Sequence, residues 1–128
     1  ARLADGHIRA ALSAGDGGTL VWPLAMGIVQ AKKYLMTGDW IDAEEAARLG
    51  LVSEVVDEGE SVERAMAVAR RFADGPQFAI RSTKMALNQW LRLGQVASFD
   101  YGLALEMLSV NHRDVSMALE RLQASAKG

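Results

Sequence analysis

The stretch SAGDGGTLVWP, from Ser13 to Pro23, places a single carboxylate, Asp16, between glycines. A carboxylate can give or accept a proton at a reacting carbon or oxygen. Glycine lets the backbone adopt positive φ and lets a ligand approach main-chain amides closely. Asp16 is therefore a candidate catalytic acid or base on a loop without side-chain bulk. The loop alone equally allows a structural interpretation, a tight turn with an ordinary turn aspartate.

The two histidines, His7 and His112, are the other candidates for chemistry. They lie far apart in the sequence, and no third ligand follows at a spacing typical of a metal site, so no metal is predicted. The glycine loop lacks the Lys-Ser or Lys-Thr pair of a phosphate-binding loop. It also lacks the strand and distal acid of a dinucleotide-binding motif. Asp16 thus remains the strongest candidate.

Composition describes an ordinary globular chain with one core. Of its 128 residues, 50% are hydrophobic and 23% charged, and the formal net charge is −2. No block of like charge stands out, so nucleic acid is not an expected partner. We expect neither a membrane span nor a signal peptide, because there is no run of about 18 apolar residues and no export pattern. The absence of cysteine fits a reducing, cytoplasmic setting.

The elements that must position the loop are mostly helices, which we expect from Leu24 onward. Apolar residues at spacings of three and four predict a helix over Ile28–Met36, with Ile28, Ala31 and Leu35 on its apolar side and Gly38 at its end. Asp42 predicts the N-cap of a short helix that stops at Gly50. Residues Leu51–Asp57 read as the single strand.

Four more helical segments follow. Ser61 is expected to cap a helix that ends before Gly75, and the next helix runs from Phe78 to Leu93, broken at Gly94. Apolar residues from Val96 to Val110 predict a further helix, and the last runs from Arg113 to Ala126. These segments predict a compact helical array behind a glycine loop, in one domain with residues 1–23 as the loop region and 24–128 as the helical region.

Three stretches carry a family resemblance: AGDGGT, then AKKYLMTGDWIDAEEAARLGLVSEVVD, then VERAMAVARRFADGPQFAIRSTKMALN. In this order they resemble the C-terminal half of the crotonase superfamily, the enoyl-CoA hydratase/isomerase family. The resemblance covers essentially all 128 residues. It implies a crotonase-like α/β spiral fold, of which these residues supply a mostly α-helical part with little strand.

The resemblance also implies an activity. Crotonase-like proteins bind acyl-CoA thioesters and polarise the thioester carbonyl with two backbone amides, an oxyanion hole that stabilises an enolate while carboxylates move the proton. Both oxyanion-hole donors and the first hydratase acid belong to the N-terminal half of the family's domain. We therefore expect these 128 residues alone to be inactive.

Aligned with the family, the second hydratase carboxylate falls on His7, where a neutral imidazole cannot replace it unchanged. Asp16 is then the remaining acid near the site, and some family members use an aspartate in this loop. The resemblance thus implies that Asp16 is the catalytic proton carrier at the α or a more distant carbon. His7 is the second catalytic candidate, and three roles stay open for it: to form a hydrogen bond, to orient water, or to take no part.

Substrate-binding positions follow from the same alignment. The loop glycines Gly15, Gly17 and Gly18 would lie beside the acyl group, with the amides of Gly17 and Gly18 lining it. Arg121 on the last helix is the candidate for the phosphates of CoA, with Lys127 second. No cofactor is expected besides the CoA thioester, which is the substrate. The family implies a homotrimer or a hexamer.

Two alternatives stay open. GDG at residues 15–17 with Trp22 and Pro23 matches family members that cleave carbon–carbon bonds in cyclic β-diketones, so the chain could belong to a retro-Claisen hydrolase. Alternatively, the chain is a catalytically silent helical module whose apolar stripes mediate oligomerisation.

Overall fold

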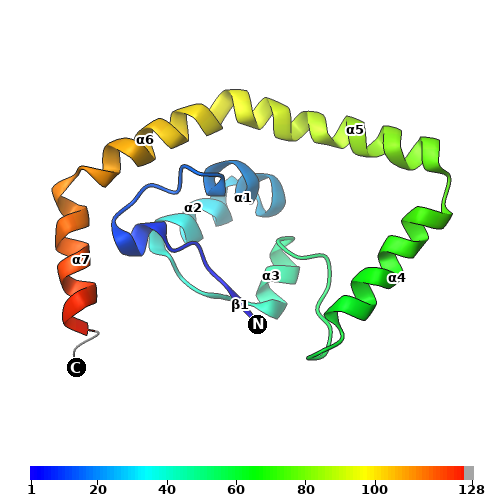
Figure 1. The fold of residues 1–128 in the computed structure, drawn as a ribbon, viewed down its shortest axis with the longest axis horizontal. Helices are drawn as coiled ribbons and strands as arrows, with labels where there is room; N and C mark the ends of the chain where they lie inside the picture. Colours follow the sequence, from blue (N-terminus) through cyan, green and yellow to red (C-terminus); the bar gives the residue numbers. More distant parts are fainter. Residues whose placement is uncertain (126–128) are drawn as a thin grey trace.

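The computed structural model describes residues 1–125, which form a small core enclosed by a long helical arch (Figure 1). Two short strands pair antiparallel, with Arg2 opposite Asp42 and Leu3 opposite Ile41. The elements of the core are β1 (Arg2–Leu3), the 3-10 helix η1 (His7–Ala10), α1 (Gly18–Met26), α2 (Ile28–Thr37), β2 (Ile41–Asp42) and α3 (Ala43–Leu49).

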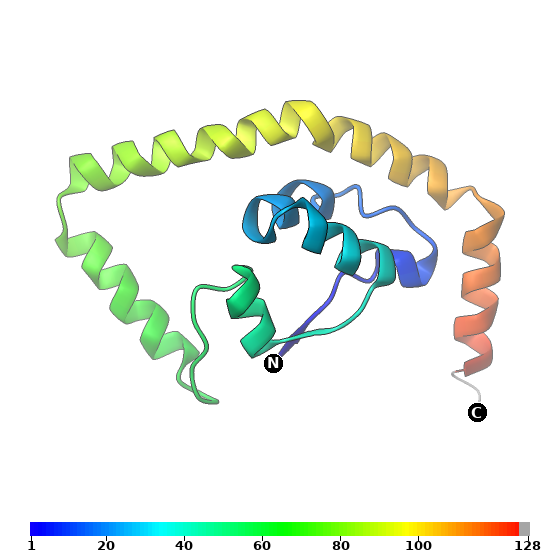
Figure 2. The ribbon, with the colours of Figure 1, turned by 180° about the vertical axis from the view of Figure 1, so that it is seen from behind.

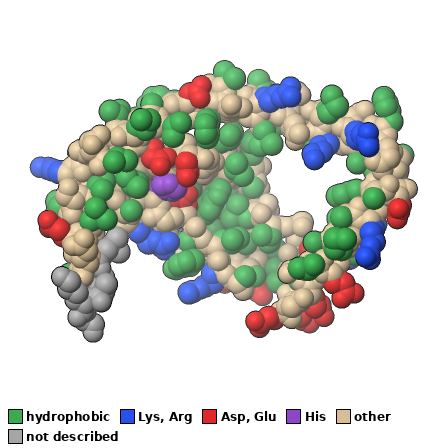
Figure 3. Space-filling model, in the orientation of Figure 1, with side chains coloured by type: hydrophobic (Ala, Val, Ile, Leu, Met, Phe, Trp, Pro, Cys, Tyr) green, Lys and Arg blue, Asp and Glu red, His purple; other side chains and the backbone are tan. Residues whose placement is uncertain are grey.

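The arch is a chain of helices that turns around this core. Figures 1 and 2 show it passing over α1 and α2 and descending on both sides of them. Its elements are α4 (Ser61–Asp74), α5 (Gln77–Gly94), a π-helical turn η2 (Gln95–Phe99), α6 (Asp100–Val110) and α7 (Arg113–Ser125). Figure 3 shows an opening between the core and the part of the arch where α4 meets α5, whereas the C-terminal end of α5 contacts α1. The predicted compact array is therefore wrong, because apolar side chains such as Val62 and Phe78 are 72% and 87% exposed instead of packing on the core.

The core is two small apolar clusters. Ala14 of the glycine loop packs with Ala31 and Leu35 of α2, while Tyr34, Ile41 and Ala46 form the second cluster. Trp22 and Met26 of α1 lie against both. The loop that carries Asp16 is thus anchored by burial of the residue two positions before it. The helix predicted at Ile28–Met36 is confirmed, although Ile28 itself is 58% exposed.

Helix ends in the core follow the predicted signals. Gly38 and Gly50 adopt left-handed backbone conformations, with φ of 69° and 89°, at the ends of α2 and α3. Asp42 is the N-cap of α3, where its Oδ1 accepts a hydrogen bond of 2.8 Å from the backbone N–H of Glu45. The predictions for both ends of α3 are therefore confirmed.

Replacing Asp42 with Ala is expected to lower the free energy of unfolding by about 1 kcal/mol, because the first turn of α3 loses its side-chain acceptor. Asp42→Asn is the matched control, since asparagine caps helices as well as aspartate does. Chemical denaturation of the complete protein measures both variants. Equal losses in the two would show that the cap hydrogen bond is not the source of the effect.

The strand predicted at Leu51–Asp57 does not form. The backbone N–H groups of Leu51 and Val52 both donate to the carbonyl oxygen of Ala46, at 2.9 and 3.4 Å, which closes the end of α3. The side chains of Leu51 and Val52 pack against the cluster of Tyr34, Ile41 and Ala46. Their apolar character is explained by this packing and not by pairing in a sheet.

Three predicted boundaries are also corrected. The helix after the glycine loop begins at Gly18, six residues before the predicted start at Leu24. Ser61 is the first residue of α4 and not its cap, because the N-cap position is Glu60. Gly94 does not break the chain of helices: its φ of −64° and ψ of −37° are helical, and a Cβ there would overlap Leu20 of α1. This glycine permits a close helix contact instead of a turn.

The last predicted helix is confirmed as α7, whose final predicted residue, Ala126, lies outside the described residues. Within residues 1–125, no helix is both long enough and apolar enough to cross a bilayer.

Candidate active site

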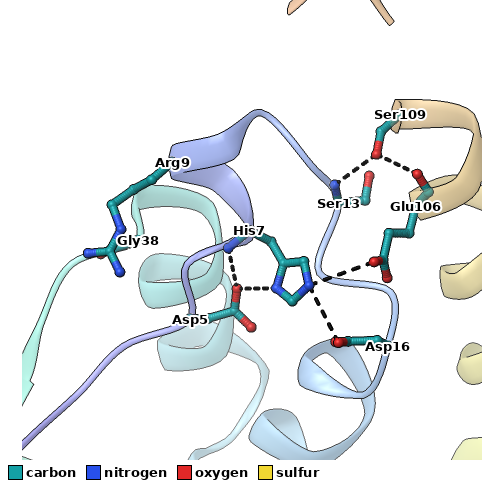
Figure 4. Close-up of polar contacts among 8 residues, drawn as sticks. All are labelled: Asp5, His7, Arg9, Ser13, Asp16, Gly38, Glu106 and Ser109. Atoms are coloured by element: carbon teal, nitrogen blue, oxygen red, sulfur yellow. Dashed lines mark hydrogen bonds and ion pairs between the residues drawn. The ribbon is translucent and has the colours of Figure 1, made fainter. Parts of the chain in front are cut away.

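His7, the first residue of η1, is held at two atoms by Asp5. The Oδ1 atom of Asp5 accepts a hydrogen bond of 3.0 Å from the backbone N–H of His7 and lies 2.8 Å from Nδ1 of its ring. The side chains are 9% exposed for Asp5 and 22% for His7. Figure 4 shows the imidazole with one ring nitrogen on Asp5 and the other directed away from it. The ring orientation is therefore fixed locally.

The free ring nitrogen of His7 faces two further carboxylates. Its Nε2 lies 3.5 Å from Oδ2 of Asp16 on the glycine loop and 3.8 Å from Oε1 of Glu106 on α6 (Figure 4). The structure thus brings the two predicted catalytic residues together. It adds a third acid from nearly 100 positions further along the chain.

Glycines at the crossing of loop and arch bring Glu106 into this group. A Cβ on Gly15 would overlap the carbonyl of Gly102 in α6 and lie 2.9 Å from Cβ of Glu106. The backbone N–H of Ser13 donates to Oγ of Ser109 over 3.2 Å, and that hydroxyl donates to the carbonyl oxygen of Glu106 over 2.7 Å. The glycine loop is therefore docked along α6, and Gly15 is required for close approach.

The next two glycines have different reasons to be there. Gly17 has a φ of 141°, which side chains rarely adopt, and it is the N-cap of α1. A Cβ on Gly18 would lie 2.8 Å from Oδ2 of Asp5, so Gly18 leaves room for the carboxylate that holds His7. That their amides line an acyl group remains a prediction.

The electrostatics of the group favour a proton on His7. Burial lowers the pKa of the imidazole, but its hydrogen bond to Asp5 and the negative charges of Asp5, Asp16 and Glu106 outweigh that effect and raise the pKa above its usual 6.5. A histidine in this setting can hold a proton near neutral pH and give it to a neighbour.

This raised pKa predicts a pH-dependent contribution of His7 to stability. The contribution is fully present below about pH 6.5, the usual pKa of the unfolded chain, and is lost as pH rises through the higher folded value. We expect the free-energy difference between wild-type protein and His7→Gln to be larger at about pH 5.5 than at about pH 8.5. Denaturation of the complete protein across this range measures it.

His112→Gln is the matched control for this prediction, because it removes a histidine whose side chain is 59% exposed on the surface at the start of α7. A difference between wild type and His7→Gln that stays constant with pH would contradict the prediction.

The second oxygen of Glu106, Oε2, is buried and accepts no hydrogen bond from the residues that the structure describes. The Glu106 side chain is 19% exposed, whereas that of Asp16 is 59% exposed. A buried carboxylate oxygen without a donor is costly unless a proton or a ligand satisfies it. Oε2 of Glu106 is therefore suited to accept a hydrogen bond from a bound molecule.

The group also contains the side-chain types that bind divalent ions. One atom from each of His7, Asp16 and Glu106 lies within 4.8 Å of the others. The spacing of the two histidines in the sequence did not predict this cluster. His112 lies elsewhere, with Nδ1 3.2 Å from Oδ2 of Asp114.

The predicted CoA-binding residue Arg121 lies apart from this group. It lines a hollow of about 540 Å³ between η1 and α7, together with Arg9, Asp114 and apolar residues, and neither His7 nor Asp16 lines that hollow. Lys127 lies outside the described residues.

Sequence reasoning missed Asp5 and Glu106. Asp5 reads as an ordinary turn residue in ADGH, with nothing to single it out. Two features of the sequence could have indicated Glu106. It is an acid on the apolar side of the helix predicted over Val96–Val110, and a glycine inside that helix, Gly102, precedes it by one helical turn.

Comparison with known proteins places this chain in a family. Residues 1–126 match the family model described as enoyl-CoA hydratase/isomerase. A crotonyl-CoA hydratase from Syntrophomonas wolfei is 32% identical over 106 residues, which cover 83% of this chain and 39% of that protein. The chain belongs to the enoyl-CoA hydratase/isomerase family, and its mostly helical structure is consistent with a part of the crotonase fold.

Two solved structures are similar in both sequence and shape. An enoyl-CoA hydratase/isomerase from Mycobacterium paratuberculosis is 40% identical, with a TM-score of 0.85, over 94% of this chain and 48% of that one. A β-diketone hydrolase from the cyanobacterium Anabaena, bound to (S)-3-oxocyclohexyl acetic acid, is 35% identical, with a TM-score of 0.78, over 84% of this chain and 44% of that one. The chain thus spans less than half the length of each of these proteins.

Proposed function

We propose that the protein acts on acyl-CoA thioesters as a hydratase or isomerase, through an enolate whose protons are moved by His7, Asp16 and Glu106. The observation that carries the proposal is that Asp16 and Glu106 both face Nε2 of His7, while Asp5 contacts Nδ1 on the other side of the ring. Family membership supplies the reaction class. The sequence predicted His7 and Asp16 for this role, and Glu106 extends it.

In the hydration direction, Asp16 accepts a proton from water while the hydroxyl oxygen bonds to the β carbon of an enoyl thioester. The electron pair of the double bond moves to the thioester oxygen as an enolate, and His7 returns a proton to the α carbon. In an isomerisation, Asp16 removes a proton from one carbon and the group returns it to another. Either route needs donors at the enolate oxygen.

Those donors would come from the part of the family's domain that is not in this chain. We propose that the 128 residues correspond to the C-terminal half of that domain and are inactive alone. Support comes from the share of the relatives that the chain spans and from the strands within residues 1–125, two of two residues each, which are few for a spiral of strand-strand-helix units.

The remaining expectations are part of the same proposal. Gly15, Gly17 and Gly18 border the acyl group, and Arg121 meets the phosphates of CoA. No cofactor takes part besides the thioester itself. Exposed apolar residues of the arch, among them Phe78, Trp90 and Val96, fit burial in a homotrimer or hexamer and against the rest of the domain. The absence of cysteine fits a cytoplasmic enzyme.

A second candidate function is hydrolysis of a cyclic β-diketone. The observation that favours it is the likeness to the Anabaena β-diketone hydrolase, and the predicted alignment of His7 with the position of a hydratase carboxylate supports it. In that reaction water adds to one carbonyl carbon and gives up its proton to the group. The bond to the central carbon then breaks, its electron pair forms the enolate of the second carbonyl, and a returned proton yields the keto acid.

Parallel assays of the complete protein separate these functions. Loss of the ultraviolet absorbance of an enoyl-CoA, or migration of its double bond, supports the thioester function. Consumption of a cyclic β-diketone with no turnover of any thioester overturns it in favour of the hydrolase. If the complete protein turns over neither substrate class but forms a stable oligomer, the result would favour the third alternative, a catalytically silent helical module.

A further inference from the structure

Asp5 is nearly buried and uses a single oxygen to hold two atoms of His7. Oδ1 is 3.0 Å from the backbone nitrogen and 2.8 Å from Nδ1 of the same residue, so the main chain and the ring are fixed together. The other oxygen, Oδ2, lies against Gly18, where a Cβ would come within 2.8 Å. Glycine at position 18 therefore leaves the space that this oxygen of Asp5 occupies.

We propose that Asp5 is a positioning residue that keeps the Nδ1 proton of His7 in place, so that Nε2 is the nitrogen that exchanges a proton with Asp16 and Glu106. The proposal deepens the proposed function and rests on it. It assigns to Asp5 no contact with substrate, only control over which ring nitrogen reacts.

The neutral imidazole of His7 has two tautomers, which differ in the ring nitrogen that carries the proton. With the proton on Nδ1, that nitrogen donates to Asp5 and the lone pair of Nε2 is free to take a proton at the site. With the proton on Nε2, the lone pair of Nδ1 would face a carboxylate oxygen at 2.8 Å with no hydrogen between them, which is unfavourable. Asp5 therefore selects the tautomer whose basic nitrogen faces the site.

Charged groups reach His7 from three elements: Asp5 from the segment before η1, Asp16 from the glycine loop and Glu106 from α6. Asp16 and Glu106 approach Nε2, and Asp5 alone approaches Nδ1. Asp5 can therefore be removed without removing the groups that exchange protons with Nε2.

Two substitutions separate the charge of Asp5 from its hydrogen bonds. Asp5→Asn retains an oxygen that can accept from both nitrogens but removes the charge. Asp5→Ala removes both. In the complete protein, we expect Asp5→Asn to shift the limb of the kcat profile that reports His7 to lower pH. We expect Asp5→Ala to lower kcat by a further tenfold or more, with KM within about threefold of wild type in both.

Asp39→Asn is the matched control, because Asp39 is an exposed aspartate in the loop between α2 and β2 and should leave the profile unchanged. If both Asp5 variants keep the wild-type kcat profile, the proposal is wrong. Should Asp5→Ala fail to fold, the isosteric Asp5→Asn still decides, through its pH profile.

A measurement without substrate distinguishes this proposal from the proposed function. Nitrogen NMR of His7 in the complete, unliganded protein at high pH reports which ring nitrogen carries the proton. We expect the proton on Nδ1 in wild type and a mixture of tautomers in Asp5→Ala. A proton on Nε2 in wild type, or no change in Asp5→Ala, overturns the role of Asp5 whatever the substrate proves to be.

Discussion

Replacing Asp16 with Asn in the complete protein is expected to lower kcat by about 10²- to 10⁴-fold, the usual cost of removing a positioned acid or base. Asparagine has nearly the same shape and can keep a contact with Nε2 of His7, 3.5 Å from the native oxygen, but it cannot take or return a proton. Because the Asp16 side chain is 59% exposed, the substitution should leave folding unaffected. Steady-state kinetics measures the loss, with the enoyl-CoA or β-diketone substrate that the parallel assays show to be turned over.

The same change at Asp39 is the control for Asp16→Asn, since it removes an exposed aspartate outside the group. The thermal unfolding of both variants should match wild type. Turnover of Asp16→Asn within about threefold of wild type would contradict the proton-transfer role. In that case His7 and Glu106, at 3.8 Å from each other, would be the pair that moves the proton.

The local parts of this fold were predictable because their causes are local. The cap at Asp42 and the left-handed glycines at 38 and 50 each depend on residues within one turn of a helix. The prediction of a strand at Leu51–Asp57 was wrong because a short run of apolar residues has the same pattern whether it pairs in a sheet or packs against the end of a helix. Only the cluster around Ile41 decides between them.

The site was half predictable for a comparable reason. The neighbouring glycines made Asp16 predictable, and the family resemblance made His7 predictable. Glu106 was not predictable, because it reaches these residues only through the docking of α6 on the loop. That docking depends on Gly15 and Gly102, which are far apart in the sequence but in contact in the structure. A pattern read along one segment contains no information on such a crossing. The open shape of the arch was likewise not predictable, because apolar periodicity predicts a buried helix face, whereas Phe78 and Val96 are 87% and 85% exposed.

Replacing Gly15 with Ala is expected to lower the free energy of unfolding of the complete protein by about 1–3 kcal/mol and to reduce kcat as well. The added Cβ would overlap the carbonyl of Gly102 and press on Cβ of Glu106, so that α6 must move away from the loop. Glu106 then withdraws from Nε2 of His7, while Asp16 and Asp5 stay with the core. Chemical denaturation and steady-state kinetics measure the two effects.

Gly6→Ala is the matched control, since a Cβ at Gly6 would come no closer than 3.6 Å to Arg9 and its φ of −92° suits alanine. Comparing Gly15→Ala with Glu106→Gln separates the two consequences of the clash, because the glutamine variant leaves the crossing intact. If the contact between Gly15 and α6 serves mainly to place the carboxylate of Glu106 beside His7, both variants should have a lower kcat and only Gly15→Ala should be less stable. A Gly15→Ala protein with wild-type stability and turnover would mean that α6 does not depend on this close contact and that Glu106 does not need it to reach His7.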